Sequence, residues 1–154
     1  MRALALLLLT LNTAWAGSVG PWIGVNTVHL NPQEPVNEHN QLIGAQYNRW
    51  FFAYFQNSFH EPSWALGYAL WQRERPFLAD HDDWRYALRL SPGVAYGYGS
   101  RLSLSVGPFT PGLIPSAGVT WQFRDNWQLG SDLLYIWTDA GGVLLHGVRL
   151  SWQW

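Results

Sequence analysis

The chain contains no cysteine among its 154 residues, so it forms neither a disulfide nor a thiolate metal site, and it has no cysteine nucleophile. Charged residues make up only 12% of the sequence, and the formal net charge is -1. A chain this close to neutral has no positive field with which to attract nucleic acid. We therefore expect no nucleic-acid partner.

The sequence also lacks an apolar run long enough to cross a membrane as a helix. The longest candidate, Ala3 to Leu11, is well short of the roughly 20 residues that a spanning helix needs. It follows Met1-Arg2 and precedes Ala14-Trp15-Ala16, an A-x-A pattern typical of signal-peptide cleavage sites. We expect residues 1–16 to be a secretory signal peptide and residues 17–154 to form one domain.

Aromatic residues are plentiful, with 11 Trp, 7 Tyr and 7 Phe, and they occur in segments of alternating polarity. At the C-terminus, one face holds Val148, Leu150, Trp152 and Trp154, and the other holds Arg149, Ser151 and Gln153. Such alternation is typical of a barrel strand with one face in lipid and the other in the lumen. The sequence therefore predicts an all-β, small antiparallel transmembrane β-barrel in the outer membrane of a Gram-negative bacterium.

The pattern predicts about eight strands. We expect them near residues 22–30, 41–48, 50–57, 64–71, 84–98, 101–123, 127–137 and 146–154. The segment 101–123 contains Pro108, Pro111 and Pro115, which remove ladder donors and should weaken pairing between strands. If this segment forms its own hairpin, the number of strands becomes ten. The lumen of so small a barrel is filled by side chains or holds one slender ligand.

Two sets of inward-facing residues are predicted for this lumen. In the fourth strand, Trp64, Leu66, Tyr68 and Leu70 share the lipid face, whereas the small residues Ala65, Gly67 and Ala69, with Trp71, share the inner face. Charged inward positions should form an ion-pair network of Arg85, Arg89, Asp132 and Arg149. We expect no metal site, and we interpret His81-Asp82-Asp83 as a solvated turn.

Two residues that could carry chemistry lie at the same end of the predicted barrel. His29 ends the first strand, and Asn57-Ser58 ends the third. A histidine beside a serine is the minimum for activating a hydroxyl, since the imidazole takes the proton as the oxygen attacks an acyl carbonyl. The alternative interpretation is a solvated loop serine and a histidine at the membrane interface.

Short motifs over most of the chain carry a resemblance to a known family. They are Thr27-Val28-His29, Asn37-Glu38 with Gly44, Gln56-Asn57-Ser58-Phe59, Gly67-Tyr68 with Trp71, Gly93-Val94, Leu113-Ile114-Pro115 with Ala117-Gly118-Val119, and the aromatic C-terminus. In these motifs the chain resembles the outer-membrane lipid A palmitoyltransferases, the PagP family. The resemblance implies an eight-stranded barrel that moves an acyl chain from a phospholipid to lipid A.

The resemblance also implies roles for individual residues. His29 and Ser58 become the catalytic pair, and Asn57 stands where the family has an aspartate. A neutral amide cannot stabilise an imidazolium as a carboxylate does, so Glu38, His39 or His60 would have to compensate.

The family buries the acyl chain in the lumen and measures its length against a glycine in the fourth strand. The resemblance places Ala69 at this position, beside Gly67, and the added methyl group should select a chain slightly shorter than palmitate. Pro111 and Pro115 match prolines that let the chain enter sideways. Asn40 stands where the family has another proline, so entry on the second side is doubtful.

Three functions remain open from the sequence. A lipid A acyltransferase would act as a monomer without a cofactor, on phospholipid and lipopolysaccharide (lipid A). A non-catalytic barrel that binds a lipid or another apolar ligand is the alternative, and the neutral Asn57 favours it. A lipid A deacylase is the third, although the His-x-Ser-Asn order of those enzymes is missing here.

Overall fold

The computed structural model describes residues 17–30, 32, 35–78, 81–99, 102, 104–138 and 141–154. The predicted signal peptide, residues 1–16, lies outside these ranges. In the described part of the chain, no helix has the length and apolar character needed to cross a membrane.

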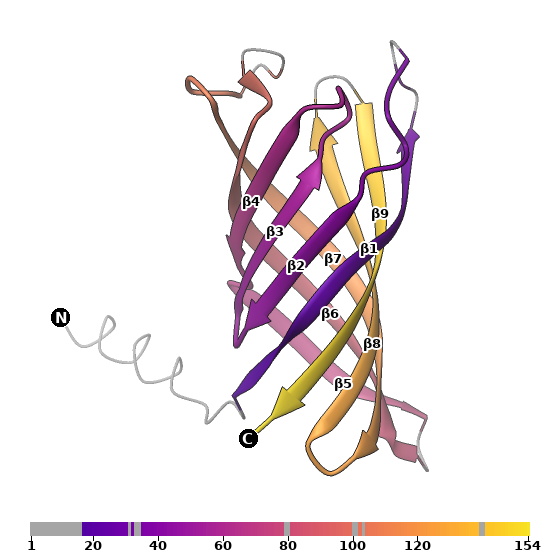
Figure 1. Ribbon diagram of the computed structural model, residues 1–154. Helices are drawn as coiled ribbons and strands as arrows, with labels where there is room; N and C mark the ends of the chain where they lie inside the picture. The colour runs from indigo at the N-terminus through magenta and orange to yellow at the C-terminus, as the bar shows by residue number, and fades with distance from the viewer. Residues whose placement is uncertain are drawn as a thin grey trace, which may run out of the picture.

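The described residues form one antiparallel sheet that closes into a barrel (Figure 1). Its strands are β1 (Ser18–Leu30), β2 (Leu42–Tyr47), β3 (Trp50–Gln56), β4 (Pro62–Tyr68), β5 (Trp71–Leu78), β6 (His81–Tyr96), β7 (Phe109–Arg124), β8 (Trp127–Thr138) and β9 (Gly141–Gln153). Neighbouring strands follow the order β4-β3-β2-β1-β9-β8-β7-β6-β5, and β4 also pairs with β6. The predicted fold class is confirmed.

The segments β4 and β5 together occupy one position in the barrel wall. Residues 64–67 of β4 pair with 93–96 of β6, and β5 pairs with the first half of the same strand. The nine segments therefore make an eight-stranded barrel, and the alternative of ten strands is wrong.

The break between β4 and β5 corrects the prediction of one continuous fourth strand. The chain leaves the ladder at Ala69 and Leu70, where the Ala69 amide donates to the Arg49 carbonyl oxygen at 2.8 Å. Ala69 is buried as predicted, but Trp71, predicted to face inward, is 49% exposed. A simple alternation cannot continue through two residues that are not in the ladder.

The first strand begins earlier than predicted, at Ser18 rather than Trp22. Val19 pairs with Tyr47 on β2 and with Trp152 on β9, so the start of β1 is hydrogen-bonded on both sides. A register shift between Gly24 and Asn26 changes the alternation once along the strand.

The outer surface is an apolar belt bounded by aromatic residues at both ends. At one end, Trp84 stacks on Trp121, and Trp152 stacks on Trp154, with ring centroids 5.9 and 5.3 Å apart. At the other end, Trp64 stacks on Tyr96 at 5.6 Å. Large apolar side chains are exposed over the wall between these ends. A surface of this kind is stable only in contact with lipid.

The inner half of the lumen holds the predicted ion-pair network. Arg89 Nη1 and Arg149 Nε donate to the two oxygens of Asp132, at 2.8 and 3.1 Å. Arg149 also donates to Ser151 and Thr120, while Glu74 of β5 lies 3.9 Å from Arg85 and 4.0 Å from Arg89. The network joins β5, β6, β8 and β9 across the barrel.

The prolines of β7 coincide with a loss of pairing on one side only. The ladder between β6 and β7 runs through Pro111 and Pro115, but the ladder between β7 and β8 stops at Ser116. A second ladder also ends early. The pairing between β1 and β2, which lie beyond β9 from β8, stops at Gly24. The β7–β8 ladder and the β1–β2 ladder thus both end within the half of the barrel that carries the end of β1.

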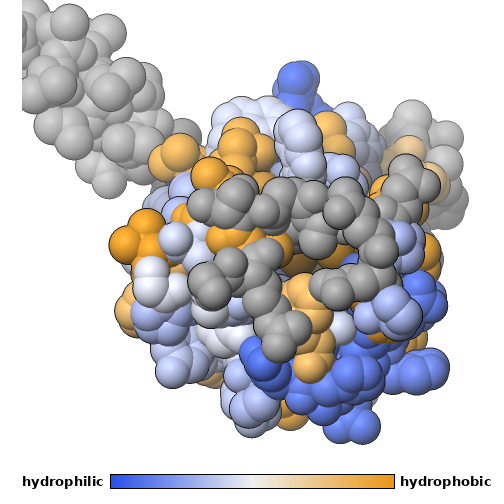
Figure 2. Space-filling model, turned by 90° about the horizontal axis from the view of Figure 1, so that it is seen from above, coloured by the Kyte–Doolittle hydropathy of each residue, from blue (hydrophilic) through white to orange (hydrophobic). Residues whose placement is uncertain are grey.

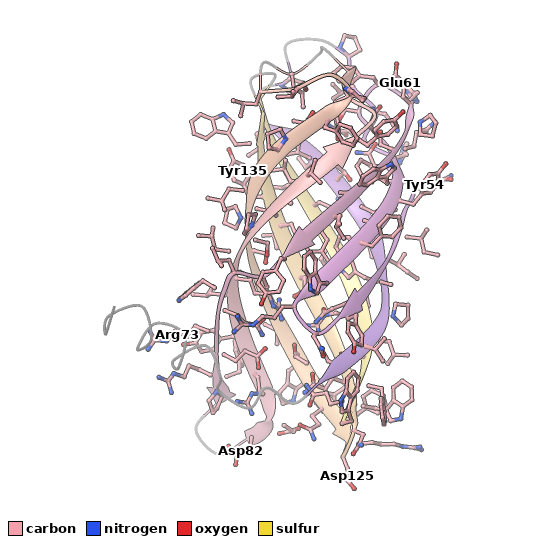
Figure 3. All side chains as sticks on the ribbon, turned by 90° about the vertical axis from the view of Figure 1, so that its left-hand side faces the viewer. Tyr54, Glu61, Arg73, Asp82, Asp125 and Tyr135 are labelled. Atoms are coloured by element: carbon pink, nitrogen blue, oxygen red, sulfur yellow. The ribbon has the colours of Figure 1, made fainter. Side chains whose placement is uncertain are left out.

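The two ends of the barrel differ in their connections. Tight turns join β2 to β3 at Asn48-Arg49, and β7 to β8 at Asp125-Asn126, at the end that also holds the C-terminus. Longer connections follow β1 and β6 at the other end, where Glu61 lies, opposite Asp82 and Asp125 (Figure 3). Outer-membrane barrels have short periplasmic turns and longer outer loops, so the end with Glu61 is expected outside the cell.

Candidate functional site

His29 and Ser58 meet at the outer end of the barrel, as the sequence places them. His29 is the penultimate residue of β1, and Ser58 lies in the turn between β3 and β4. The distance between His29 Nε2 and Ser58 Oγ is 2.7 Å, a hydrogen bond between residues 29 positions apart in the chain. Ser58 is 8% exposed, and His29 is half-buried. This is the arrangement that activates a serine hydroxyl for attack on an acyl carbon.

The structure gives Asn57 hydrogen bonds to the backbone rather than to the imidazole. Its Oδ1 accepts from the amides of Phe59 and Glu61, at 2.8 and 3.0 Å, and its Nδ2 donates to the Gly97 carbonyl oxygen at 3.0 Å. The residue is completely buried. Asn57 therefore closes the turn that carries Ser58 and ties this turn to the segment after β6.

The loop after β1 is held against the same turn by Asn37. The Asn37 amide donates to the Ser58 carbonyl oxygen at 2.9 Å, and its side chain donates to the Asn57 carbonyl oxygen at 3.4 Å. The same side chain also contacts Asn40 and accepts from the amide of His39. These bonds bring the loop and its Glu38 to the site.

Of the predicted supporting residues, Glu38 is exposed and lies in the loop that Asn37 holds against the turn. His29 Nδ1 is buried and has no hydrogen-bond partner among the described residues. His60 has a positive φ of 65° and an exposed side chain, and its backbone bonds to Asn57 and Gln56. No third residue of the kind found in a catalytic triad is bonded to His29 in the described part.

Tyr98 is a further residue of the site, and the sequence analysis did not identify it. Burial raises the pKa of Tyr98 to about 12. The ring contacts Phe55 and Phe59, with centroids 6.5 and 6.4 Å away. The turn that carries Ser58 is thus packed against the segment that follows β6.

The predicted acyl-pocket residues lie deeper in the lumen. Gly67 packs against Phe51 so closely that a Cβ on Gly67 would be 2.3 Å from the ring. Ala69 lines a cavity of about 70 Å³ that Trp22 and Phe51 also line, and that reaches the ion-pair network. By volume this cavity holds a few water molecules and no long chain.

An apolar cluster of Trp22, Leu42, Ala53 and Leu145 fills the lumen, with Phe55 and Leu134 packed against it. Along β1, the cluster residue Trp22 lies seven positions before His29, on the side of the ion-pair network. In the structure, side chains therefore separate the His29–Ser58 pair from the cavity at Ala69.

In the view of the outer end in Figure 2, the most hydrophilic residues gather toward one side of the rim, and hydrophobic residues are scattered among paler ones over the rest. Among the described residues, no three His, Asp or Glu side chains are arranged to hold a metal ion.

No family model matches the chain, and no curated protein matches it. Among solved structures, it is similar to neisserial surface protein A (NspA), with 14% identity and a TM-score of 0.52 over 90% of this chain and 96% of that chain. Ail, the attachment invasion locus protein of Yersinia pestis, has 13% identity and a TM-score of 0.41, covering 91% and 100% of the two chains. A de novo designed transmembrane β-barrel has 15% identity and a TM-score of 0.40, covering 92% and 98%.

At these identities the comparisons show the fold alone, that of the small outer-membrane barrels. The fold agrees with the apolar belt and its two aromatic borders, which require a bilayer around the strands. The predicted location, the outer membrane of a Gram-negative bacterium, agrees with this fold.

Proposed function

We propose that the protein is a lipid acyltransferase that acts at the outer leaflet, with Ser58 as nucleophile and His29 as general base. The contact of 2.7 Å between His29 Nε2 and Ser58 Oγ carries this proposal. The resemblance to the lipid A palmitoyltransferases supports it, and it suggests phospholipid as the acyl donor and lipid A as the acceptor. The proposed reaction uses no cofactor.

In the first half-reaction, Ser58 Oγ attacks the ester carbonyl of the phospholipid and transfers its proton to His29 Nε2. The ester C–O bond then breaks, and His29 returns the proton to the departing oxygen, which leaves a lysophospholipid and acyl-Ser58. In the second, a hydroxyl of lipid A attacks the acyl carbon and gives its proton to His29 Nε2; the bond between the acyl carbon and Ser58 Oγ then breaks, and His29 returns the proton to Ser58 Oγ. Neither half-reaction requires a change of oxidation state.

An acyl chain that enters the lumen below Ser58 meets the apolar cluster first. Cluster residues offer a favourable surface for methylene groups, but they leave no free volume for a long chain. Phe51 would have to move from Gly67 before a chain reached Ala69. The proposal therefore includes repacking of these side chains, and a preference for chains shorter than palmitate because Ala69 carries a methyl group.

The two places where pairing stops offer routes for such a chain. Residues 109–115 of β7 and 135–138 of β8 lie beyond the end of their common ladder, and residues 25–30 of β1 lie beyond the end of the ladder with β2. Backbone that is not paired with a neighbouring strand separates more easily than a continuous ladder.

A non-catalytic barrel is the second candidate, and the filled lumen favours it. The apolar cluster and the ion-pair network leave only a small cavity in the described part of the lumen. The hydrogen bonds of Asn57 within the β3–β4 turn explain this residue without a catalytic role. In this case the hydrogen bond between His29 and Ser58 would serve only to hold the outer end together.

Mass spectrometry of lipid A separates the candidates. We expect lipid A from cells expressing the wild type, in a host without its own acyltransferase, to gain the mass of one acyl chain. Ser58→Ala and His29→Ala should abolish the gain, because they remove the nucleophile and the base, while the barrel still folds. A mass loss would favour a deacylase, and an unchanged lipid A would favour the non-catalytic barrel. Palmitate as the best donor would contradict the role of Ala69.

A further inference from the structure

We propose that Arg73 and Arg75 of β5 form a binding site for the phosphate group of an anionic phospholipid in the inner leaflet of the outer membrane. The site lies in the part of the barrel that is expected near the periplasm, away from His29 and Ser58. It does not depend on the proposed acyl transfer. A lipid bound there holds the inner end of the barrel at a fixed depth in the membrane.

The two arginines point to the outside of the wall. β5 pairs with β6 so that Arg73 lies opposite Leu88 and Arg75 lies opposite Tyr86. Residues directly opposite each other in an antiparallel ladder share one face of the sheet, and Leu88 is an exposed residue of the apolar belt. Figure 3 shows Arg73 projecting from the wall in the half of the barrel that ends at Asp82.

Aromatic residues place this part of β5 at the inner boundary of the membrane. Trp71 and Phe77 flank the arginines along the strand, and both rings are exposed. Tyr86, the partner of Arg75, lies two residues from Trp84 of the inner aromatic border. Aromatic side chains concentrate at the level of the lipid headgroups. The guanidinium groups reach the same level, because their aliphatic stems extend along the apolar surface.

The protein itself does not neutralise these two cations in the part of the chain that the structure describes. Glu74 lies between them in the sequence, but its carboxylate is directed to the other face of the strand, 3.9 Å from Arg85 and 4.0 Å from Arg89. The ion pairs among the described residues include neither Arg73 nor Arg75. Guanidinium groups beside an apolar belt therefore take their counter-charge from outside the protein.

A phosphodiester fits these groups by charge and by spacing. A guanidinium group binds two phosphate oxygens at once through paired N–H donors. Alternate residues of a strand are about 7 Å apart, so two long side chains on one face can reach the same phosphate. Among the described strands, β5 bonds only to β6, and its other edge offers peptide N–H groups as further donors for an anion. A zwitterionic headgroup fits less well, because the arginines repel its ammonium group.

Native mass spectrometry of the purified barrel in detergent measures this binding, with phosphatidylglycerol as the probe and phosphatidylcholine of the same acyl chains as the comparison. We expect the wild type to bind phosphatidylglycerol at the lower lipid concentration. Arg73→Gln and Arg75→Gln should each weaken binding of phosphatidylglycerol about 5-fold, and the double variant about 25-fold, the effect of losing one and two basic residues beside an anionic lipid.

Arg124→Gln is the matched control, because it removes the same charge from an exposed residue at the end of β7. It should bind phosphatidylglycerol like the wild type, and heat-dependent migration on gels should show all variants folded. An equal loss of binding in Arg124→Gln would indicate diffuse attraction and overturn the inference, as would equal binding of both lipids by the wild type. Displacement of phosphatidylglycerol by millimolar inorganic phosphate would also overturn it, since the ligand would then be a free anion.

Discussion

At the scale of single residues, the hydrogen bonds of Asn57 decide what its substitution can do. Both side-chain atoms bond to backbone groups, so a carboxylate at this position would not be directed at His29. It would instead place an oxygen against the Gly97 carbonyl oxygen in a site with no access to solvent. The asparagine at this position therefore serves the β3–β4 turn rather than the imidazole.

Asn57→Asp should therefore lower stability and leave Ser58 no more reactive. We expect a loss of about 1–3 kcal/mol in the free energy of unfolding, the cost of an unsatisfied buried polar group. Unfolding in urea within lipid vesicles measures this loss, and fluorophosphonate labelling measures the reactivity. Faster labelling of the aspartate variant would show that the carboxylate reaches the imidazole after all.

The residues of the site were predictable to different degrees. His29 and Ser58 could be paired because each ends a strand at the same end of a barrel, and alternation locates strand ends. The contact of Tyr98 with Phe59 in the same turn was not predictable, since Tyr98 follows the alternating part of β6 and its position depends on how β6 closes against β4. The packing of Phe51 against Gly67 could not be predicted either, because it depends on the side-chain rotamer of Phe51 and not on the polarity pattern of the sequence.

At the scale of strands, the ion-pair network joins parts of the wall that are distant in sequence. Asp132 of β8 accepts from Arg89 of β6 and Arg149 of β9, and all three side chains are largely buried. Removal of the carboxylate charge would leave two guanidinium groups close together without a counter-charge.

Asp132→Asn should accordingly reduce the free energy of unfolding by about 3 kcal/mol, the cost of breaking a buried pair at one partner. Asp125→Asn is the control, since Asp125 is exposed in the β7–β8 turn and should change stability by less than about 0.5 kcal/mol. Urea unfolding of both variants in the same vesicles measures the difference. Equal stabilities would mean that water or other side chains replace the pair.

The strands themselves were largely predictable, and the errors lie where hydrogen bonding departs from a simple ladder. Alternation places Arg85 and Arg89 correctly because β6 pairs regularly with β5 from Arg85 to Leu90. It misplaces Trp71 because the chain skips the ladder at Ala69-Leu70. Hydrogen bonds to a distant backbone group, such as that between Ala69 and Arg49, leave no trace in local polarity.

At the scale of the whole molecule, the orientation of the barrel in the membrane can be tested with single introduced cysteines, because the sequence contains no native cysteine. Val106 lies in the connection between β6 and β7 and is 75% exposed, whereas Asp125 lies in a turn at the opposite end. We expect a membrane-impermeant maleimide to label Val106→Cys in intact cells, and Asp125→Cys only after the outer membrane is permeabilised. The reverse pattern would place His29 and Ser58 in the periplasm, away from the outer leaflet.

The barrel as a whole was the easiest feature to predict, because the bilayer imposes the same alternation on every strand that crosses it. The number of strands also followed from this repeated constraint. The contents of the lumen did not, since a closed wall of this size is compatible with a ligand or with side chains alone.

The split of one strand into β4 and β5 also affects how the protein avoids aggregation through an unpaired strand edge. Among the described strands, β5 bonds only to β6, so its other edge exposes peptide groups that could add a foreign strand. The sequence along this edge contains Arg73, Arg75 and Pro76, with both arginines exposed. Charge and proline are the gatekeepers that block edge-to-edge aggregation. The unpaired edge of β5 is thereby protected against growth by strand addition.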